Sequence, residues 1–106
     1  MIYHVRARFR PETASDLLNK LGDGTIGRQV PDGSEIVASM NRAVITEDGV
    51  VEWTELCFCA TPLQHERSTV LDSYFDDIVT ERTSAHQRFD GTPFMQHLES
   101  VAGQSS

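Results

Sequence analysis

Hydrophobic and polar residues alternate over the first ten positions of the chain, MIYHVRARFR. One side of such an extended segment carries the apolar residues Tyr3, Val5, Ala7 and Phe9. The other side carries Ile2, His4, Arg6 and Arg8. A period of two predicts a β-strand here, with its apolar side against helices and its charged side on an open face.

A helix is predicted over residues 11–22, because the apolar residues of PETASDLLNKLG recur with helical spacing. Residues 22–34 are rich in turn formers and contain Gly22, Gly24 and Gly27 in the order G-x-G-x-x-G. The dinucleotide-binding fingerprint needs these glycines to follow a strand and open a helix, whereas here they close one. A plain loop is therefore the preferred interpretation.

The middle of the chain predicts two further strands, at residues 35–45 and 50–60. The Asp-Gly signal in TEDGV joins them into an antiparallel hairpin. A second helix is then predicted, with Thr61 as N-cap, proline in the first turn and Gln64 at the capping-box position. Its buried stripe is expected to consist of Val70, Leu71, Tyr74 and Phe75.

The end of the chain predicts a fourth strand at IVTERTS, residues 78–84, and a terminal helix over residues 93–101. The fold class is therefore α+β, a ferredoxin-like β-α-β-β-α-β antiparallel sheet with a C-terminal helix. No repeat or linker interrupts the pattern, and a single domain over residues 1–106 is expected.

The third predicted strand contributes side chains to both faces of the sheet. Alternation places Trp53, Glu55, Cys57 and Cys59 on one side of it. In the ferredoxin-like order the first and third strands are neighbours, and the first strand's apolar side faces the helices. The helix-free face is therefore expected to combine Trp53, Glu55 and both cysteines with His4 and the two arginines. A tryptophan among charges on an open face would be exposed to solvent, so the pattern predicts that this face is covered.

The stretch CFCATPLQHER suggests a metal or thiol site by its composition. Two cysteines separated by one residue on a strand have Cα atoms about 6.5–7 Å apart, so a disulfide between them is not expected. Zinc usually has four ligands, and two thiolates with His65 on a following helix leave that set incomplete. Free cysteine often packs as a small buried hydrophobe. Simple packing is therefore preferred over a reactive thiol or a metal site, and no metal is predicted.

The composition of the chain limits the classes of partner that we expect. The net charge is −7 with nine basic residues, which argues against nucleic acid or an anionic membrane surface. No apolar run approaches the length of a membrane span, and the charged start differs from a secretory signal. Two cysteines provide no disulfide framework, so a cytoplasmic location is expected. A chain of 106 residues builds a modest core, which favours a partner subunit.

The element order, the small size and the polar-aromatic open face resemble the dimeric α/β-barrel superfamily. That resemblance implies a homodimer in which two sheets face each other around a cavity. VEWTELCFCATPLQHERSTV is similar to antibiotic-biosynthesis monooxygenases in carrying Trp53 on the third strand and His65 on the next helix. Haem-degrading members add an asparagine on the first strand, and residues 2–9, IYHVRARF, contain none. Haem ligation and oxygen activation are therefore not expected, and no cofactor is predicted.

A second resemblance concerns whole short proteins. DGTIGRQVPDGSEIVASMNRAV followed by TPLQHERSTV resembles a set of bacterial proteins of this length, including the small ferredoxin-like protein of prodigiosin-type pigment clusters. This resemblance implies secondary metabolism and a pyrrole-like ligand.

The open face therefore predicts a site for a small planar metabolite in the homodimer cavity. Arg6 and Arg8 are expected to hold an anionic group, and Trp53 to stack on a ring. His4 or Glu55 is expected to transfer a proton, with the arginines keeping Glu55 ionised. The other candidate ligand-binding residues are Cys57, Cys59 and His65. The alternatives are a cofactor-free or haem-dependent monooxygenase of the antibiotic-biosynthesis type, a non-catalytic ligand-binding or interaction protein, and a purely structural set of cross-strand ion pairs.

Overall fold

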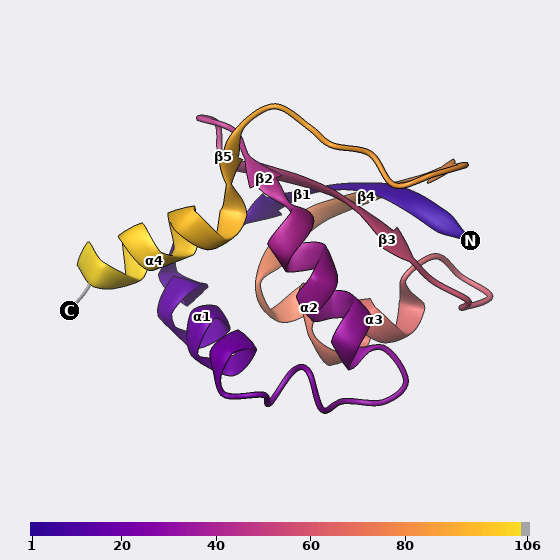
Figure 1. Ribbon diagram of the computed structural model, residues 1–106, viewed down its shortest axis with the longest axis horizontal. Coiled ribbons are helices and arrows are strands. Elements are labelled where there is room, and N and C mark those ends of the chain that lie inside the picture. The colour runs from indigo at the N-terminus through magenta and orange to yellow at the C-terminus, as the bar shows by residue number, and fades with distance from the viewer. Residues whose placement is uncertain (105–106) are drawn as a thin grey trace.

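The chain folds into a five-stranded antiparallel sheet with its helices gathered on one face (Figure 1). This computed structural model describes residues 1–104. The strands are β1 (Ile2–Phe9), β2 (Val44–Ile45), β3 (Val50–Leu56), β4 (Phe75–Thr83) and β5 (Thr92–Pro93), in the spatial order β4-β1-β3-β2-β5. The helices are α1 (Ala14–Gly22), α2 (Gly33–Arg42), α3 (Gln64–Thr69) and α4 (Phe94–Gln104), with short 3₁₀ turns at Pro11–Thr13 and Leu71–Ser73.

Several predictions from the sequence are confirmed. The first strand, the helix that follows it, the strand beginning at Val50, and the terminal helix all occur close to their predicted positions. The turn before β3 uses Gly49 at φ 83°, a left-handed conformation that glycine adopts without steric cost. β1 and β3 are neighbours and pair antiparallel, as expected. Among residues 1–104, no helix has the length and apolar character required to cross a membrane.

The strand predicted at residues 35–45 is wrong, because most of this segment forms α2. Ile36 and Met40 are buried one helical turn apart, with Ser39 buried beside them. Isoleucine and valine favour strands, but here the apolar positions recur at helical spacing and pack the helix on β3. Only Val44 and Ile45 remain as a strand.

The second predicted helix is much shorter than expected. It begins after Leu63 rather than at Thr61, whose carbonyl oxygen accepts the Gln64 backbone N–H at 3.1 Å. The predicted stripe is buried, but it follows the helix: Leu71 lies in a 3₁₀ turn, and Phe75 is the first residue of β4. The third strand also ends early, at Leu56, so the cysteines lie beyond it.

Strand pairing reverses the predicted orientation of β3. Val5 lies opposite Trp53, and Tyr3 lies opposite Glu55. Directly paired residues project to the same face of a sheet, so Trp53 and Glu55 share the helix-covered face with the apolar side of β1. Both side chains have no exposed surface. The prediction that they lie on the open face is therefore wrong.

The open face, opposite the helices, is partly covered by the chain itself. Residues 84–91 connect β4 to β5 and pass over the sheet on the side away from the helices (Figure 1). His86 Nδ1 lies 2.8 Å from Thr54 Oγ1, and the Phe89 ring stacks on His4 with centroids 4.6 Å apart. The segment therefore buries Thr54 and shelters His4, while Arg6 and Arg8 stay exposed.

Candidate functional site

A pocket of about 450 Å³ lies where β3 ends, between the start of α2 and the helix α3. Its walls are formed by Pro31, Asp32, Ser34, Glu35, Leu56, Cys57, Phe58, Cys59 and Glu66. We call it the cysteine pocket. No lysine or arginine occurs among these described lining residues, and three of them carry carboxyl groups. The pocket is therefore acidic.

The two thiols come together because the chain leaves the sheet after Leu56. The Cys57 backbone N–H still donates to the Met1 carbonyl at 2.8 Å, which extends the β1 pairing by one residue. The chain then turns, and the Cys59 backbone N–H donates to Cys57 Sγ at 3.3 Å. Cys57 is buried and Cys59 half-buried. The predicted strand geometry for the pair is therefore wrong, and the sulfurs share one pocket.

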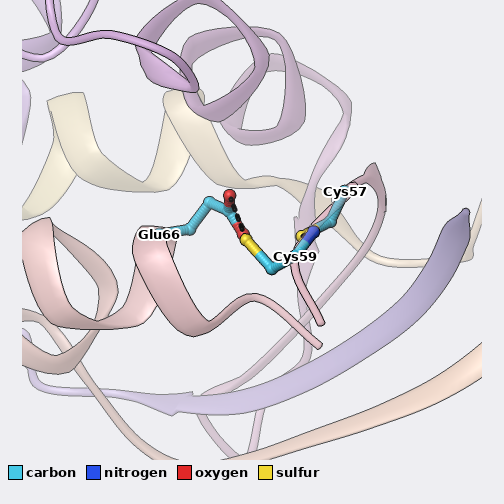
Figure 2. Close-up of side chains that lie close together, drawn as sticks. All are labelled: Cys57, Cys59 and Glu66. Carbon is cyan, nitrogen blue, oxygen red and sulfur yellow. Dashed lines mark hydrogen bonds between the residues drawn. The ribbon is translucent and has the colours of Figure 1, made fainter. Parts of the chain in front are cut away.

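Glu66 approaches these sulfurs from α3 (Figure 2). Cys59 lies between Cys57 and Glu66, and its thiol donates to Glu66 Oε1 at 3.7 Å. Glu66 is only 1% exposed, and its Oε2 atom has no hydrogen-bond partner. Burial, followed by the neighbouring carboxyl group of Asp32, raises the pKa of Glu66. The pocket therefore contains a buried carboxyl group with one oxygen unsatisfied.

The start of α3 sets this geometry. Leu63 is fully buried and adopts φ 56°, which is uncommon for a bulky residue. The left-handed turn lets the Leu63 backbone N–H reach Cys57, and the following helical turn carries Glu66 inward. The chain thus accepts local backbone strain where it places a thiol and a carboxyl group together.

His65 and Asp32 form a hydrogen-bonded pair beside Glu66, through Nδ1 and a carboxylate oxygen. Asp32 immediately precedes α2, and His65 is the second residue of α3, so the pair joins the two helices across the pocket wall. The ligand atoms of Asp32, His65 and Glu66 lie within 4.8 Å of one another. Each of the two pair members is therefore already partnered, unlike Glu66 Oε2.

Cys57 is not a reactive nucleophile in this state. Burial raises the pKa of its thiol to about 12, although the backbone N–H groups of Cys59 and Leu63 act in the opposite direction. A thiol reacts as its thiolate, and this one stays protonated at neutral pH. Thiol and carboxyl donors at this spacing are instead the types that ligate a transition metal.

Glu55 lies behind the pocket in the core. Its Oε1 accepts the Trp53 indole N–H at 2.8 Å, and its Oε2 has no partner. Burial raises the pKa of Glu55 to about 8; the carboxylates of Glu66 and Glu35 add to the rise, and the Trp53 hydrogen bond opposes it. Glu55 is therefore mainly protonated at neutral pH, and the predicted ionised base beside arginines is wrong.

The residues predicted on β1 lie away from this pocket, on the open face. His4 Nε2 contacts Glu52 Oε2 at 2.8 Å, and Arg8 Nη1 donates to the Asp48 carbonyl at 3.0 Å. Arg6 is exposed. The predicted site residues therefore separate into three places: the open face, the core with Trp53 and Glu55, and the cysteine pocket with Cys57, Cys59 and the adjacent His65.

Several pocket residues were absent from the predicted set. Asp32 was missed because residues 22–34 were interpreted as a plain loop, and Glu35 because residues 35–45 were interpreted as a strand rather than a helix. Glu66 adjoins His65 in sequence, but its burial depends on the turn at Leu63. Phe58 was also missed, and its side chain is 85% exposed at the pocket.

Comparison of the chain with protein-family models, curated proteins and solved structures found no match. The site is therefore interpreted from its own geometry.

Proposed function

We propose that the protein binds a small planar molecule in the cysteine pocket, and that this molecule presents a positive charge or N–H donors to the pocket wall. The observation that carries the proposal is the exposed Phe58 ring at an acidic pocket: an 85% exposed phenylalanine beside Asp32 and Glu66. A volume of about 450 Å³ lies within the range of small-molecule sites, roughly 300–1,000 Å³.

The ligand's chemistry follows from the pocket lining. An aromatic face attracts a flat ring by stacking and a cation through its quadrupole. Arg42 Nη2 donates to Glu35 at 2.7 Å, and His65 Nδ1 is bonded to Asp32. The unpaired Oε2 of Glu66 is therefore the carboxyl oxygen left for a ligand. The pyrrole-like ligand implied by the sequence resemblance has the same features, a flat ring and an N–H donor.

Binding, rather than acid–base catalysis, is the function that these residues support. The two candidate proton-transfer residues both lie away from this pocket: Glu55 is buried in the core, and His4 lies on the opposite face of the sheet. In this proposal Phe58, rather than Trp53, stacks on the ring of the ligand.

We also propose that the fold is a variant of the ferredoxin-like plan. The order β4-β1-β3-β2 with every neighbour antiparallel supports this assignment, and α2, β5 and α4 are additions to it. The homodimer expected from the sequence stays a prediction. A second copy docked on the open face would contact residues 84–91 as well as the sheet.

Benzamidine and benzoate test the ligand class, because both are planar and they differ in charge. With chelator and a phosphine reductant present, benzamidine should shift the amide resonances of the cysteine pocket, and benzoate should not. Phe58→Ala should weaken benzamidine binding about 2- to 10-fold, since one aromatic contact contributes about 0.5–1.5 kcal/mol.

Phe89→Ala is the matched control, because it removes an aromatic ring from the open face and should leave binding unchanged. Equal binding of both probes would refute the charge argument. Shifts centred on His4 and Phe89 would move the site to the open face.

A further inference from the structure

We propose that Cys57, Cys59 and Glu66 bind a thiophilic divalent metal ion, with Zn²⁺ as the natural candidate, at the base of the cysteine pocket. This inference shares its pocket with the proposed function and rests on that assignment of the site, but it requires no organic ligand. It adds a cofactor to a site for which the sequence alone predicts none.

The spacing of the donor atoms fits tetrahedral coordination. One donor atom from each of the three residues lies within 4.8 Å of the other two. In a tetrahedral zinc site with Zn–S of about 2.3 Å and Zn–O of about 2.1 Å, sulfur and oxygen ligands lie about 3.6 Å apart. Cys59 Sγ and Glu66 Oε1 are already 3.7 Å apart (Figure 2). The other two donor pairs lie within 4.8 Å, so these donors approach by at most roughly 1 Å to hold the ion.

The unsatisfied oxygen of Glu66 is an independent indication of a missing partner. A buried carboxyl group normally has hydrogen bonds to both oxygens, and leaving one unpaired costs free energy. Glu66 is 1% exposed, and its Oε2 has none. A metal ion at the base of the pocket supplies a partner of opposite charge to this carboxylate.

Two backbone N–H groups are directed at the sulfur of Cys57, although burial otherwise keeps this thiol protonated. The N–H groups belong to Cys59 and Leu63, and such hydrogen bonds stabilise negative charge on the sulfur. When the ion binds, each thiol releases its proton to solvent and the sulfur's lone pair forms the metal bond. The cost of burying the charge is then offset by the metal.

The ligand types select the metal. Thiolates favour zinc and other thiophilic ions, whereas magnesium and calcium require oxygen ligands throughout. Three protein ligands leave a fourth position open toward the pocket, which is the arrangement of zinc sites that accept a further ligand. The Asp32–His65 pair is adjacent to Glu66 and occupied with its own hydrogen bond, so we assign it an orienting role outside the coordination shell.

A bound metal ion is also compatible with the positive charge proposed for the organic ligand. Two thiolates and one carboxylate outweigh a divalent ion by one negative charge. The loaded pocket therefore remains acidic toward an organic molecule that approaches along Phe58.

Metal titration of the reduced, chelator-stripped protein tests the proposal. Zn²⁺ should bind at one ion per chain by calorimetry, and Mg²⁺ should give no binding heat. Co²⁺ should give a tetrahedral visible spectrum together with a thiolate-to-cobalt charge-transfer band. Cys59→Ser and Glu66→Gln should each weaken Zn²⁺ binding by more than about 10-fold, the lower limit seen even for residues that only orient ligands.

Glu55→Gln is the matched control, since Glu55 is also a buried carboxyl group but lies outside the donor set, and it should bind Zn²⁺ like wild type. Circular dichroism of each variant separates loss of binding from loss of folding, and half-buried Cys59 is the site least damaging to change. Absent Zn²⁺ binding, or equal binding after Cys59→Ser, would overturn the proposal. A Co²⁺ spectrum without the charge-transfer band would instead place the ion on Asp32, His65 and Glu66. These titrations contain no benzamidine, so the two proposals succeed or fail separately.

Discussion

At the scale of single residues, Glu55 couples the stability of the core to pH. Its carboxyl group has a pKa of about 8 in the folded chain against 4.5 for a solvated glutamate, chiefly because it is buried. The folded state therefore holds the proton more tightly than the unfolded state. This contribution to stability is complete below about pH 4.5 and is lost as the pH rises through about 8.

We therefore expect the metal-free protein to become less stable between about pH 5 and about pH 9, by about 1.4 kcal/mol for each unit of pKa difference traversed. Glu55→Gln removes this titrating group while keeping the acceptor for the Trp53 indole N–H, so it should reduce the slope, and Glu66, whose pKa is also raised, accounts for what remains. Urea unfolding at several pH values, with chelator present, measures the slope.

The exposed residue Glu99 provides the comparison, and Glu99→Gln should retain the wild-type slope. If Glu55→Gln and wild type lose stability in parallel as the pH rises, another group is responsible for the loss.

The same residue explains why the faces of β3 were predicted incorrectly. A glutamate beside a tryptophan suggests a polar surface, because glutamate is assumed to carry its charge. Once protonated and bonded to Trp53, Glu55 is a neutral polar group that a core accommodates. Protonation depends on burial, which a linear sequence does not reveal. The first strand, with its clean alternation, had no such ambiguity and was predicted correctly.

At the scale of elements, the approach of α2 to the loop before it depends on Gly33. A Cβ atom at this position would lie 2.2 Å from the Ile26 carbonyl oxygen and 2.9 Å from that of Gly27. Both contacts are with backbone, which cannot rotate away. We expect Gly33→Ala to destabilise the protein by about 1–3 kcal/mol and to perturb Asp32 at the pocket wall.

Gly22→Ala is the corresponding control at the end of α1, where a Cβ atom would meet nothing within 4 Å. It should leave stability unchanged or raise it by up to about 1 kcal/mol. Thermal unfolding of both variants distinguishes crowding from a general intolerance of alanine. Equal melting temperatures for Gly33→Ala and wild type would show that the loop relaxes without cost.

Element types were predicted well where a pattern is local and poorly where packing decides. The Asp-Gly turn and the amphipathic terminal helix follow from short-range chemistry, and both occur. Residues 33–42 contain Ile36 and Val37, which favour strands, yet the core accepts this segment only as a helix. The cysteine pocket depended on that helix and on the turn at Leu63. The sequence therefore provided the pocket's thiols and His65 but not the acids that complete it.

At the scale of the whole molecule, the remaining question is whether two copies associate through the open face. Val79 is 56% exposed there, opposite Arg6 on the neighbouring strand, whereas residues 84–91 already cover Thr54 and His4. We expect a dimer at micromolar concentration in sedimentation velocity, and Val79→Asp should shift it toward monomer by placing an unpaired charge in the contact.

Lys20→Gln, on α1 of the helical face, lowers the chain's net charge by the same one unit as Val79→Asp and should leave association intact. A monomer at every concentration would mean that residues 84–91 cover the open face without a second copy of the chain. The proposed ligand and metal sites would stand in that case, because both lie within one chain.

The bulge in β4 affects whether other chains can add strands to the edge of the sheet. β4 is a nine-residue strand at the edge of the sheet, and such an edge offers a row of free backbone groups on which other chains can polymerise. Its register shifts opposite the stretch between Arg6 and Arg8, and Asp77 there adopts φ 53°. This bulge interrupts the row and places charge beside it. We therefore expect the bulge at Asp77 to hinder the addition of strands from other chains along β4.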